Sequence, residues 1–251
     1  MTWALDLDGV LWRGDVAIPG SAGAVAALRS RGERVVFLTN NSHERVESYV
    51  AKLERMGVTT SATDVITSGQ AAASLLEPGT SALVCAGPGV AEALEGAGVR
   101  VVEDGPADAV VVGWHSSFDY GRLTVAAAAV LGGARLVGTN DDATYPAADG
   151  LIPGGGALLA AVAYASGATP EVAGKPNAAM VALVHRRIGP IEVMVGDRPN
   201  TDGLLARNLE ARFCLVLSGV TRDTDLPVDP EPDFVASDLA GLVSRWDRWA
   251  G

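Results

Sequence analysis

The sequence predicts an α/β protein in which helices cover mostly parallel sheets. Apolar strand-like runs and helical runs alternate along all 251 residues, which is the pattern of parallel strands joined by helical crossovers. Thirty glycines and only 5% aromatic residues indicate many tight turns and cores of Ala, Val and Leu. A hydrophobic content of 48% with 20% charged residues is typical of a globular chain.

The first part of the chain predicts three strands, each followed by a helix. Strands are expected at Thr2–Leu7, Arg34–Leu38 and Val65–Thr67, and helices at Ala22–Arg31, His43–Met56 and Gln70–Leu76. Gly32 ends the first helix, and Ser42 is the predicted N-cap of the second, because a Ser hydroxyl can accept from the first free N–H groups of a helix.

A second series of strands and helices begins after Pro78-Gly79. A third series begins after Pro170, and its sequence is similar in character to the first part of the chain. The middle section predicts strands at Ala82–Ala86, Val99–Val102, Ala109–Gly113 and Arg135–Thr139, and helices at Val90–Gly96, Tyr120–Leu131 and Ala157–Ser166. The last section predicts helices at Asn177–Ile188 and Asp202–Leu209, and strands at Ile191–Val195 and Phe213–Leu217. We therefore expect a core made of residues 1–78 and 173–251, with an inserted α/β domain at residues 79–172.

Charge and composition argue against several classes of partner. A net charge of −11 disfavours nucleic acid, because such binding depends on Lys and Arg neutralising phosphates. An anionic small ligand would need a local cation or metal to attract it. No basic or apolar leader begins the sequence and every apolar run is interrupted early, short of the ~20 residues that a membrane span needs, so a cytoplasmic protein is expected. Cys85 and Cys214 lie in apolar runs and are expected to be buried, reduced and inert.

Polar residues gather directly after predicted strands or at helix starts. The four clusters are Asp6-Leu7-Asp8-Gly9, Thr39-Asn40-Asn41, Gly174-Lys175-Pro176 and Gly196–Asp202. In an open parallel sheet the carboxyl ends of the strands line one crevice. Clusters that are far apart in sequence can therefore meet there.

The first cluster suggests metal and phosphate chemistry. The side chains of Asp6 and Asp8, two residues apart at the end of a strand, point the same way, and Gly9 lets the chain turn sharply after them. Two such carboxylates repel each other, so a cation or a proton must stabilise them. Mg²⁺ takes one or two carboxylates together with phosphate and water, and Asp197 is a natural second carboxylate. A surface turn, a helix cap at Thr39–Asn41 and a solvated lysine would explain the clusters singly, but together and in this order they favour chemistry.

These clusters, together with TNDDATYP at Thr139–Pro146 and LVLSGVT at Leu215–Thr221, resemble the haloacid dehalogenase superfamily of phosphohydrolases. Within it they resemble the NagD-like group, which carries an inserted cap domain of the C2 type. The resemblance covers essentially the whole chain. It implies a Rossmann-like parallel-sheet core, a Mg²⁺ cofactor and a phosphatase that forms an aspartyl-phosphate.

The resemblance also implies roles for the acidic residues. Asp6 is the expected nucleophile, and Asp8 is the expected acid that protonates the leaving oxygen and then the base that activates water. Mg²⁺ would be bound by the Asp6 carboxylate, the Asp8 backbone carbonyl and Asp197. Asp202 would hold the water shell of the metal.

The remaining roles belong to phosphate and substrate binding. By resemblance, Thr39 and the Asn40 amide would hold the phosphoryl oxygens, and Lys175 would neutralise them and orient Asp6. Two cap loops, Gly113–Ser116 and Asn140–Pro146, are expected over the site. The candidate substrate contacts are Asn41, Trp114, Asp142 and Tyr145.

The expected partner is a small phosphorylated metabolite, with glycerol 3-phosphate or 2-phosphoglycolate ranked first from a resemblance to glycerol-3-phosphate phosphatases of the actinobacterial type. Sugar phosphates, nucleoside monophosphates and pyridoxal phosphate stay open, and so does a homodimer.

Two readings from other classes compete with a phosphatase. A phospho-acceptor module like the response-regulator receivers would lack the long insert, and a silent interaction protein would not need Asp6, Asp8, Lys175 and Asp197. Gly87-Pro88-Gly89 faintly resembles a dinucleotide fingerprint, but Glu92 stands at the place of its third glycine.

Overall fold

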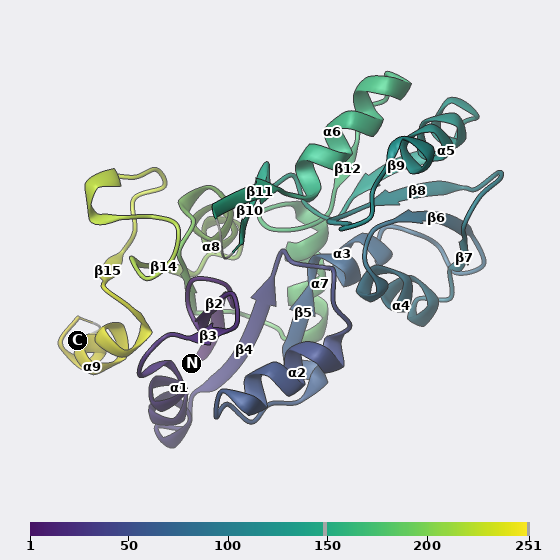
Figure 1. Cartoon of the computed structure of the whole chain (residues 1–251). Coiled ribbons are helices and arrows are strands. Elements are labelled where there is room, and N and C mark those ends of the chain that lie inside the picture. Colours follow the sequence, from purple (N-terminus) through teal and green to yellow (C-terminus); the bar gives the residue numbers. More distant parts are fainter. Residues whose placement is uncertain (148–149, 250–251) are drawn as a thin grey trace. The chain divides into compact units, whose positions relative to one another are not determined.

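The computed structural model describes residues 1–147 and 150–249 (Figure 1). Its chain forms two compact units. The first contains Met1–Thr39, Glu47–Ile66 and Val184–Gly251, and the second contains Asn40–Val46 and Thr67–Leu183. The second unit is larger than the predicted insert at residues 79–172, and the bounds of that insert stay a prediction.

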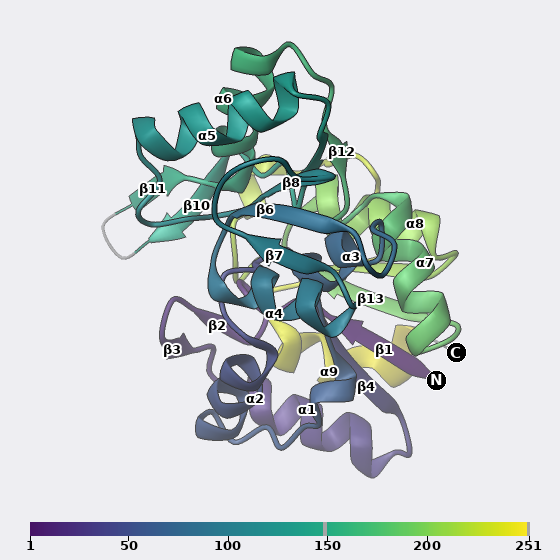
Figure 2. The same cartoon turned by 90° about the vertical axis from the view of Figure 1, so that its right-hand side faces the viewer.

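The first unit is built on a six-stranded sheet in the order β15-β14-β13-β1-β4-β5. Its strands are β1 (Thr2–Leu5), β4 (Arg34–Thr39), β5 (Val65–Thr67), β13 (Val193–Gly196), β14 (Arg212–Val216) and β15 (Phe234–Ala236). In the centre, Leu5 of β1 lies opposite Phe37 of β4 and Val195 of β13 in parallel register. These strands read as continuous apolar runs because both faces of a parallel sheet are covered. β1 thus has a parallel neighbour on each side, and Figure 2 shows it beside β4.

Helices and a tryptophan cluster complete the core of the first unit. Its helices are α1 (Ser21–Ser30), α2 (Val46–Arg55), α8 (Leu204–Asn208) and α9 (Leu239–Trp249), and α7 (Ala178–Arg187) ends in it. Trp3 of β1 meets Trp246 of α9 edge to face with ring centroids 4.5 Å apart, and Phe234 of β15 meets the same ring at 5.2 Å. Such aromatic contacts add to the free energy gained by burying the rings.

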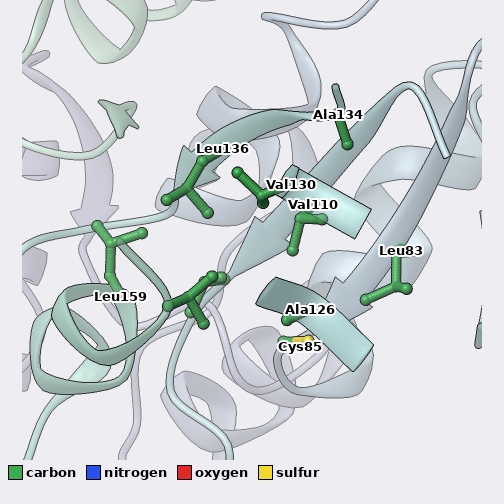
Figure 3. Close-up of a cluster of buried hydrophobic side chains, with 10 residues drawn as sticks. Leu83, Cys85, Val110, Ala126, Val130, Ala134, Leu136 and Leu159 are labelled. Atoms are coloured by element: carbon green, nitrogen blue, oxygen red, sulfur yellow. The ribbon is translucent and has the colours of Figure 1, made fainter. Parts of the chain in front are cut away.

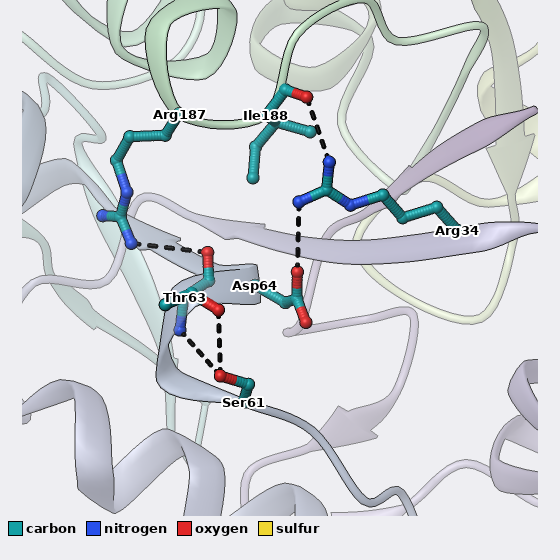
Figure 4. A network of polar contacts seen from close by, with 6 residues as sticks. All are labelled: Arg34, Ser61, Thr63, Asp64, Arg187 and Ile188. Atoms are coloured by element: carbon teal, nitrogen blue, oxygen red, sulfur yellow. Dashed lines mark hydrogen bonds and ion pairs between the residues drawn. The ribbon is translucent and has the colours of Figure 1, made fainter.

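Polar contacts tie the loop before β5 to the end of α7 (Figure 4). Arg34 donates to the carbonyl of Ile188 at 3.1 Å and lies 3.4 Å from the Asp64 carboxylate. Arg187 donates to the carbonyl of Thr63 at 3.4 Å. These exposed contacts fix loop ends more than they stabilise the fold.

The second unit has its own parallel sheet of five strands in the order β12-β9-β8-β6-β7. Its strands are β6 (Ser81–Cys85), β7 (Arg100–Val102), β8 (Ala109–Val112), β9 (Arg135–Gly138) and β12 (Glu171–Val172). Its helices are α3 (Ser68–Ala73), α4 (Pro88–Gly96), α5 (Tyr120–Leu131) and α6 (Gly155–Ser166), and β10 (Thr144–Ala147) pairs with β11 (Gly150–Pro153) in a hairpin. Figure 2 shows α5 and α6 side by side, and both contact β8.

A compact apolar cluster lies between this sheet and its helices (Figure 3). The strands contribute Leu83, Val110 and Leu136, while Ala126 comes from α5 and Leu159 from α6. All five side chains are buried. Their small and branched shapes match the core of Ala, Val and Leu that the composition predicts.

The predicted α/β class with a parallel-sheet core is confirmed, but the helix predicted at His43–Met56 begins later, at Val46. The Ser42 hydroxyl lies four residues before that start and does not cap the helix. It donates to Thr139 Oγ1 at 3.0 Å, and the N–H of Val46 donates instead to the Glu92 carboxylate at 3.3 Å. The carbonyl of His43 accepts the N–H of Gly89 at 2.9 Å. These long-range bonds hold the segment outside the helix.

Several other elements also differ from the prediction. The helix predicted at Asp202–Leu209 is replaced by a π-helical turn at Pro199–Gly203 followed by α8. The predictions missed the antiparallel pair of β2 (Trp12–Arg13) and β3 (Val16–Ala17), the pair of β10 and β11, and also β12, β15 and α9. Within the described ranges, no helix is long and apolar enough to cross a membrane.

Candidate active site

The first group of candidate residues lies at one edge of the six-stranded sheet. Asp6 directly follows β1, Asp197 directly follows β13, and Thr39 is the last residue of β4. Since β1 lies between β13 and β4 in parallel register, the carboxyl ends of the three strands share this edge. The Asp6 N–H donates to the carbonyl of Val195 at 2.9 Å, which continues the strand pairing into the site. Ligands of open α/β sheets bind at such an edge.

Asp6, Asp197 and Asp202 form a cluster of buried carboxylates. One oxygen of each lies within 4.8 Å of the others. Their exposed fractions are 6%, 2% and 1%. Three carboxylates so close together repel, and burial penalises their charged form, so a cation or protons must neutralise them. A hard divalent cation, which takes oxygen ligands, fits this donor set.

The loop after β14 and two glycines hold Asp197 in place. The N–H of Val220 donates to Asp197 Oδ2 at 2.6 Å, and the Thr221 hydroxyl donates to the Asp197 carbonyl at 2.5 Å. A Cβ atom on Gly9 would lie 2.4 Å from Asp197 Oδ2, and one on Gly219 only 1.9 Å from it. The carboxylate therefore occupies space that only glycines at these two positions leave open.

Asp8 and Asp202 are each oriented by a neighbour on their own loop. The indole N–H of Trp12 donates to Asp8 Oδ1 at 3.0 Å, and the Gly9 N–H donates to the Trp12 carbonyl at 2.7 Å. Asp202 Oδ2 accepts the N–H of Arg198 at 3.1 Å. Sequence reasoning gave Trp12 no role, although it lies only three residues after Gly9 of the first cluster.

The second group of candidate residues lies in the second unit around Asn40. Its side-chain carbonyl accepts the N–H of Lys175 at 2.7 Å. Its side-chain NH₂ donates to the carbonyl of Lys175 at 3.1 Å and to Asp142 Oδ2 at 3.2 Å. Asn40 and Lys175 are buried, with exposed fractions of 9% and 2%. Three predicted residues from distant motifs are thus joined by side-chain hydrogen bonds.

Ser68, which the sequence did not single out, and Asn140 of the expected cap loop hold Asn40 itself. The Ser68 hydroxyl donates to the Asn40 carbonyl at 2.6 Å, and the Asn140 side chain donates to it at 2.8 Å. A Cβ atom on Gly174 would lie 2.6 Å from Asn40 Oδ1 and 2.5 Å from the Thr139 carbonyl. Thr139 and Asn140 belong to the quoted TNDDATYP motif, which is the only sequence signal for them. Ser68 carries none.

Aromatic side chains accompany the remaining candidates of the second unit. Asn41 donates to the hydroxyl of Tyr145 at 3.3 Å. The Tyr145 ring lies 5.6 Å from that of Trp114, and His43 meets Trp114 edge to face at 4.6 Å. Asn41, Trp114 and Tyr145 are therefore neighbours, as their shared assignment to substrate contact requires.

The two cysteines take no part in either group. Both are buried free thiols. Burial raises the pKa of Cys85 to about 11 and also raises the pKa of Cys214. Neither thiol therefore ionises near neutral pH.

Comparisons with known proteins match this architecture. Residues 3–100 match a family model described as haloacid dehalogenase-like hydrolase, and residues 172–242 match a second, HAD-hydrolase-like model. An acid sugar phosphatase of Staphylococcus saprophyticus is 30% identical over 98% of both chains. The human glycerol-3-phosphate phosphatase is 35% identical over 96% of this chain and 89% of its own length.

A solved structure shares the fold. The glycerol phosphate phosphatase of Mycobacterium tuberculosis in complex with magnesium superposes with a TM-score of 0.89 at 33% identity. The match covers 96% of this chain and 75% of that chain.

Proposed function

Because this chain belongs to the haloacid dehalogenase-like hydrolase family and is a phosphatase, we propose that it hydrolyses small phosphomonoesters with Mg²⁺ through an aspartyl-phosphate on Asp6. The observation that carries the proposal is the buried cluster of Asp6, Asp197 and Asp202, whose oxygens lie within 4.8 Å of one another. A phosphatase that draws an anionic substrate to a chain of net charge −11 needs local positive charge. This cluster is where a cation can supply it.

The proposed metal ligands are the carboxylates of Asp6 and Asp197 and the backbone carbonyl of Asp8. Asp202, whose carboxylate belongs to the same cluster, would hold the water shell. When bound, Mg²⁺ supplies the positive charge that lets these carboxylates stay ionised beside a phosphate. The magnesium complex of the M. tuberculosis relative supports this choice of ion.

Asp6 and Asp8 divide the chemistry. Asp6 attacks phosphorus, so that a carboxylate oxygen–phosphorus bond forms and the bond to the leaving oxygen breaks. Asp8 gives its proton to the leaving oxygen and then takes one from the water that hydrolyses the acyl phosphate. The Trp12 indole at 3.0 Å from Asp8 Oδ1 holds that carboxyl group in one orientation.

Three further residues act on the phosphoryl group. We assign its oxygens to the hydroxyl of Thr39 and an amide of Asn40, and its neutralisation to Lys175. The burial of Thr39 and Lys175, which are 1% and 2% exposed, supports these assignments, because hydrogen bonds and charges act more strongly where water is excluded.

The substrate proposal rests on the relatives and on the second unit. Glycerol 3-phosphate and 2-phosphoglycolate rank first because the human and M. tuberculosis relatives are glycerol phosphate phosphatases. Sugar phosphates come next, on the strength of the staphylococcal relative. Residues 79–172 would act as a NagD-like cap that selects the leaving group, with contacts from Asn41, Trp114, Asp142 and Tyr145. We expect a cytoplasmic enzyme without nucleic-acid or membrane partners, and a homodimer is the assembly to test against a monomer.

A phosphate-release screen tests this function. The panel contains glycerol 3-phosphate, 2-phosphoglycolate, sugar phosphates, nucleoside monophosphates and pyridoxal phosphate, each with Mg²⁺ and with EDTA. We expect Mg²⁺-dependent turnover of at least one compound, and a loss of at least about 10⁴-fold in Asp6→Asn, since its amide is a poor nucleophile. A panel without turnover would overturn the proposal. Phosphorylation of the protein without turnover would favour a phospho-acceptor module.

A further inference from the structure

We infer that the side chain of Asn40 is a positioning residue, which fixes Lys175 and Asp142 and does not itself bind the transferring phosphoryl group. The inference rests on the proposed function, because it concerns how Lys175 is presented for that reaction. It narrows the role of Asn40, which the family resemblance gives only as an amide that holds phosphoryl oxygens. The backbone N–H of Asn40 is left as the amide for that task.

The hydrogen-bonding capacity of the Asn40 side chain is taken up within the protein. A primary amide offers two N–H donors and one carbonyl oxygen. The NH₂ group donates to the Lys175 carbonyl at 3.1 Å and to Asp142 Oδ2 at 3.2 Å. The carbonyl oxygen accepts the Lys175 N–H at 2.7 Å. A phosphoryl oxygen needs a donor, and both donors of this group already have acceptors.

The orientation of the amide follows from its partners. The N–H of Lys175 can only donate, so the group that faces it at 2.7 Å must be the Asn40 carbonyl oxygen. The Lys175 carbonyl and an ionised Asp142 carboxylate can only accept hydrogen bonds, so both must face the NH₂ group of Asn40. Turning the amide over would oppose donor to donor and acceptor to acceptor.

The two bonds to Lys175 bracket a single residue. One Asn40 amide bonds both the N–H and the C=O of Lys175, which restrains the backbone dihedrals of that residue and hence the direction of its side chain. A lysine side chain is long and flexible. Fixing the backbone of Lys175 therefore limits the positions that its ammonium group can reach. Gly174 permits the close approach, since a Cβ there would lie 2.6 Å from Asn40 Oδ1.

The main chain of Asn40 is itself held by two further hydrogen bonds. The backbone carbonyl of Asn40 accepts from the Ser68 hydroxyl at 2.6 Å and from the Asn140 side chain at 2.8 Å. These bonds use the main chain of Asn40, so they remain when its side chain is truncated. Truncation should therefore release Lys175 and Asp142 while leaving residue 40 in place.

A kinetic double-mutant cycle tests the inference. The variants are Asn40→Ala, Lys175→Met and the double substitution, assayed with p-nitrophenyl phosphate and Mg²⁺. We expect Asn40→Ala to lower kcat by about 10- to 100-fold, as loss of an orienting partner does, but by less than about threefold when Lys175 is already Met. An equal loss in both backgrounds would overturn the inference, because Asn40 would then act independently of Lys175.

Asn177→Ala is the matched control. Asn177 also donates a side-chain hydrogen bond to this turn, to the Gly174 carbonyl at 2.9 Å, but it does not bond Lys175. We expect kcat to stay within about threefold of the wild type, as for substitutions outside the coupled network. A loss equal to that of Asn40→Ala would mean that general loosening of the turn explains both, and would overturn the positioning role.

Hydrogen exchange gives a readout that needs no turnover. In the ligand-free protein, the Lys175 amide should exchange at least about tenfold faster in Asn40→Ala than in the wild type or in Asn177→Ala. Unchanged exchange would overturn the bond to Lys175 even if the phosphatase is active. If the Lys175 amide exchanges faster in Asn40→Ala but the wild type hydrolyses none of the phosphomonoesters, the proposed function is overturned and the bond between Asn40 and Lys175 is still established.

Discussion

Gly9→Ala is predicted to damage the carboxylate cluster without removing a carboxylate. Gly9 has a φ of +84°, and a Cβ atom there would lie 2.4 Å from Asp197 Oδ2 and 3.0 Å from the Cα of Gly219. The Asp197 carboxylate must therefore shift. Gly14 offers a matched control, because its φ is +53° but nothing lies within 4 Å of a Cβ atom placed on it.

The two substitutions share one cost and differ in a second. Each puts alanine into the left-handed region, at about 1–2 kcal/mol, and each gains similarly from a less flexible unfolded chain. Only Gly9→Ala adds overpacking against a buried side chain, at about 1–3 kcal/mol. We therefore expect Gly9→Ala to lose about 1–3 kcal/mol more unfolding free energy than Gly14→Ala.

Urea unfolding with and without Mg²⁺ measures both effects. A ligand that binds the folded state stabilises it by RT ln(1 + [L]/Kd), and a tenfold weaker Kd removes about 1.4 kcal/mol of that gain. The wild type and Gly14→Ala should gain equally from Mg²⁺, whereas Gly9→Ala should gain about 1 kcal/mol less. Equal losses of stability and equal gains from Mg²⁺ in the two variants would refute the reasoning.

Four other predictions cover the core, the surface, a thiol and the metal. Leu83→Ala should cost about 2–5 kcal/mol in urea unfolding, because this side chain lies fully buried in the apolar cluster of the second unit. Asp64→Asn should change stability by less than about 1 kcal/mol, because its partner Arg34 is 47% exposed. Burial raises the pKa of Cys85 to about 11, so its protonated form stabilises the fold fully below the unfolded pKa of about 8.5. That contribution should be lost as pH rises from about 9 to 11, and iodoacetamide at pH 8 should label Cys85 far more slowly in the native protein than in urea. Removing divalent metal with EDTA should abolish phosphate release, and adding Mg²⁺ back should restore it.

Local sequence signals predicted the regular parts of the fold well. The helix Tyr120–Leu131 and the strand Val65–Thr67 have their predicted bounds. Asp119 is the N-cap of that helix. The strand ends at Thr67 because Thr67 is the N-cap of the next helix, α3. The start of α2 could not be predicted in the same way. Ser42 has the right chemistry for a cap, but its hydroxyl bonds Thr139, which is 97 residues away.

The candidate site also contains residues that the sequence could predict and contacts that it could not. Their positions after predicted strands singled out Asp6 and Asp197, because the carboxyl ends of parallel strands can meet at one edge. The family resemblance added the role of Asp202, and one carboxylate oxygen of each residue lies within 4.8 Å of the others. The bonds of Ser68 and Asn140 to the carbonyl of Asn40 depend on tertiary approach. Nothing local in the sequence encodes them.

The stereochemical course at phosphorus tests the central claim, the aspartyl-phosphate on Asp6, most directly. Wild-type enzyme would transfer a phosphoryl group made chiral with oxygen isotopes to an acceptor alcohol. Each in-line displacement inverts the configuration, so attack by Asp6 followed by attack on the acyl phosphate predicts net retention. Net inversion would mean that the acceptor attacks the substrate directly, and would contradict the account.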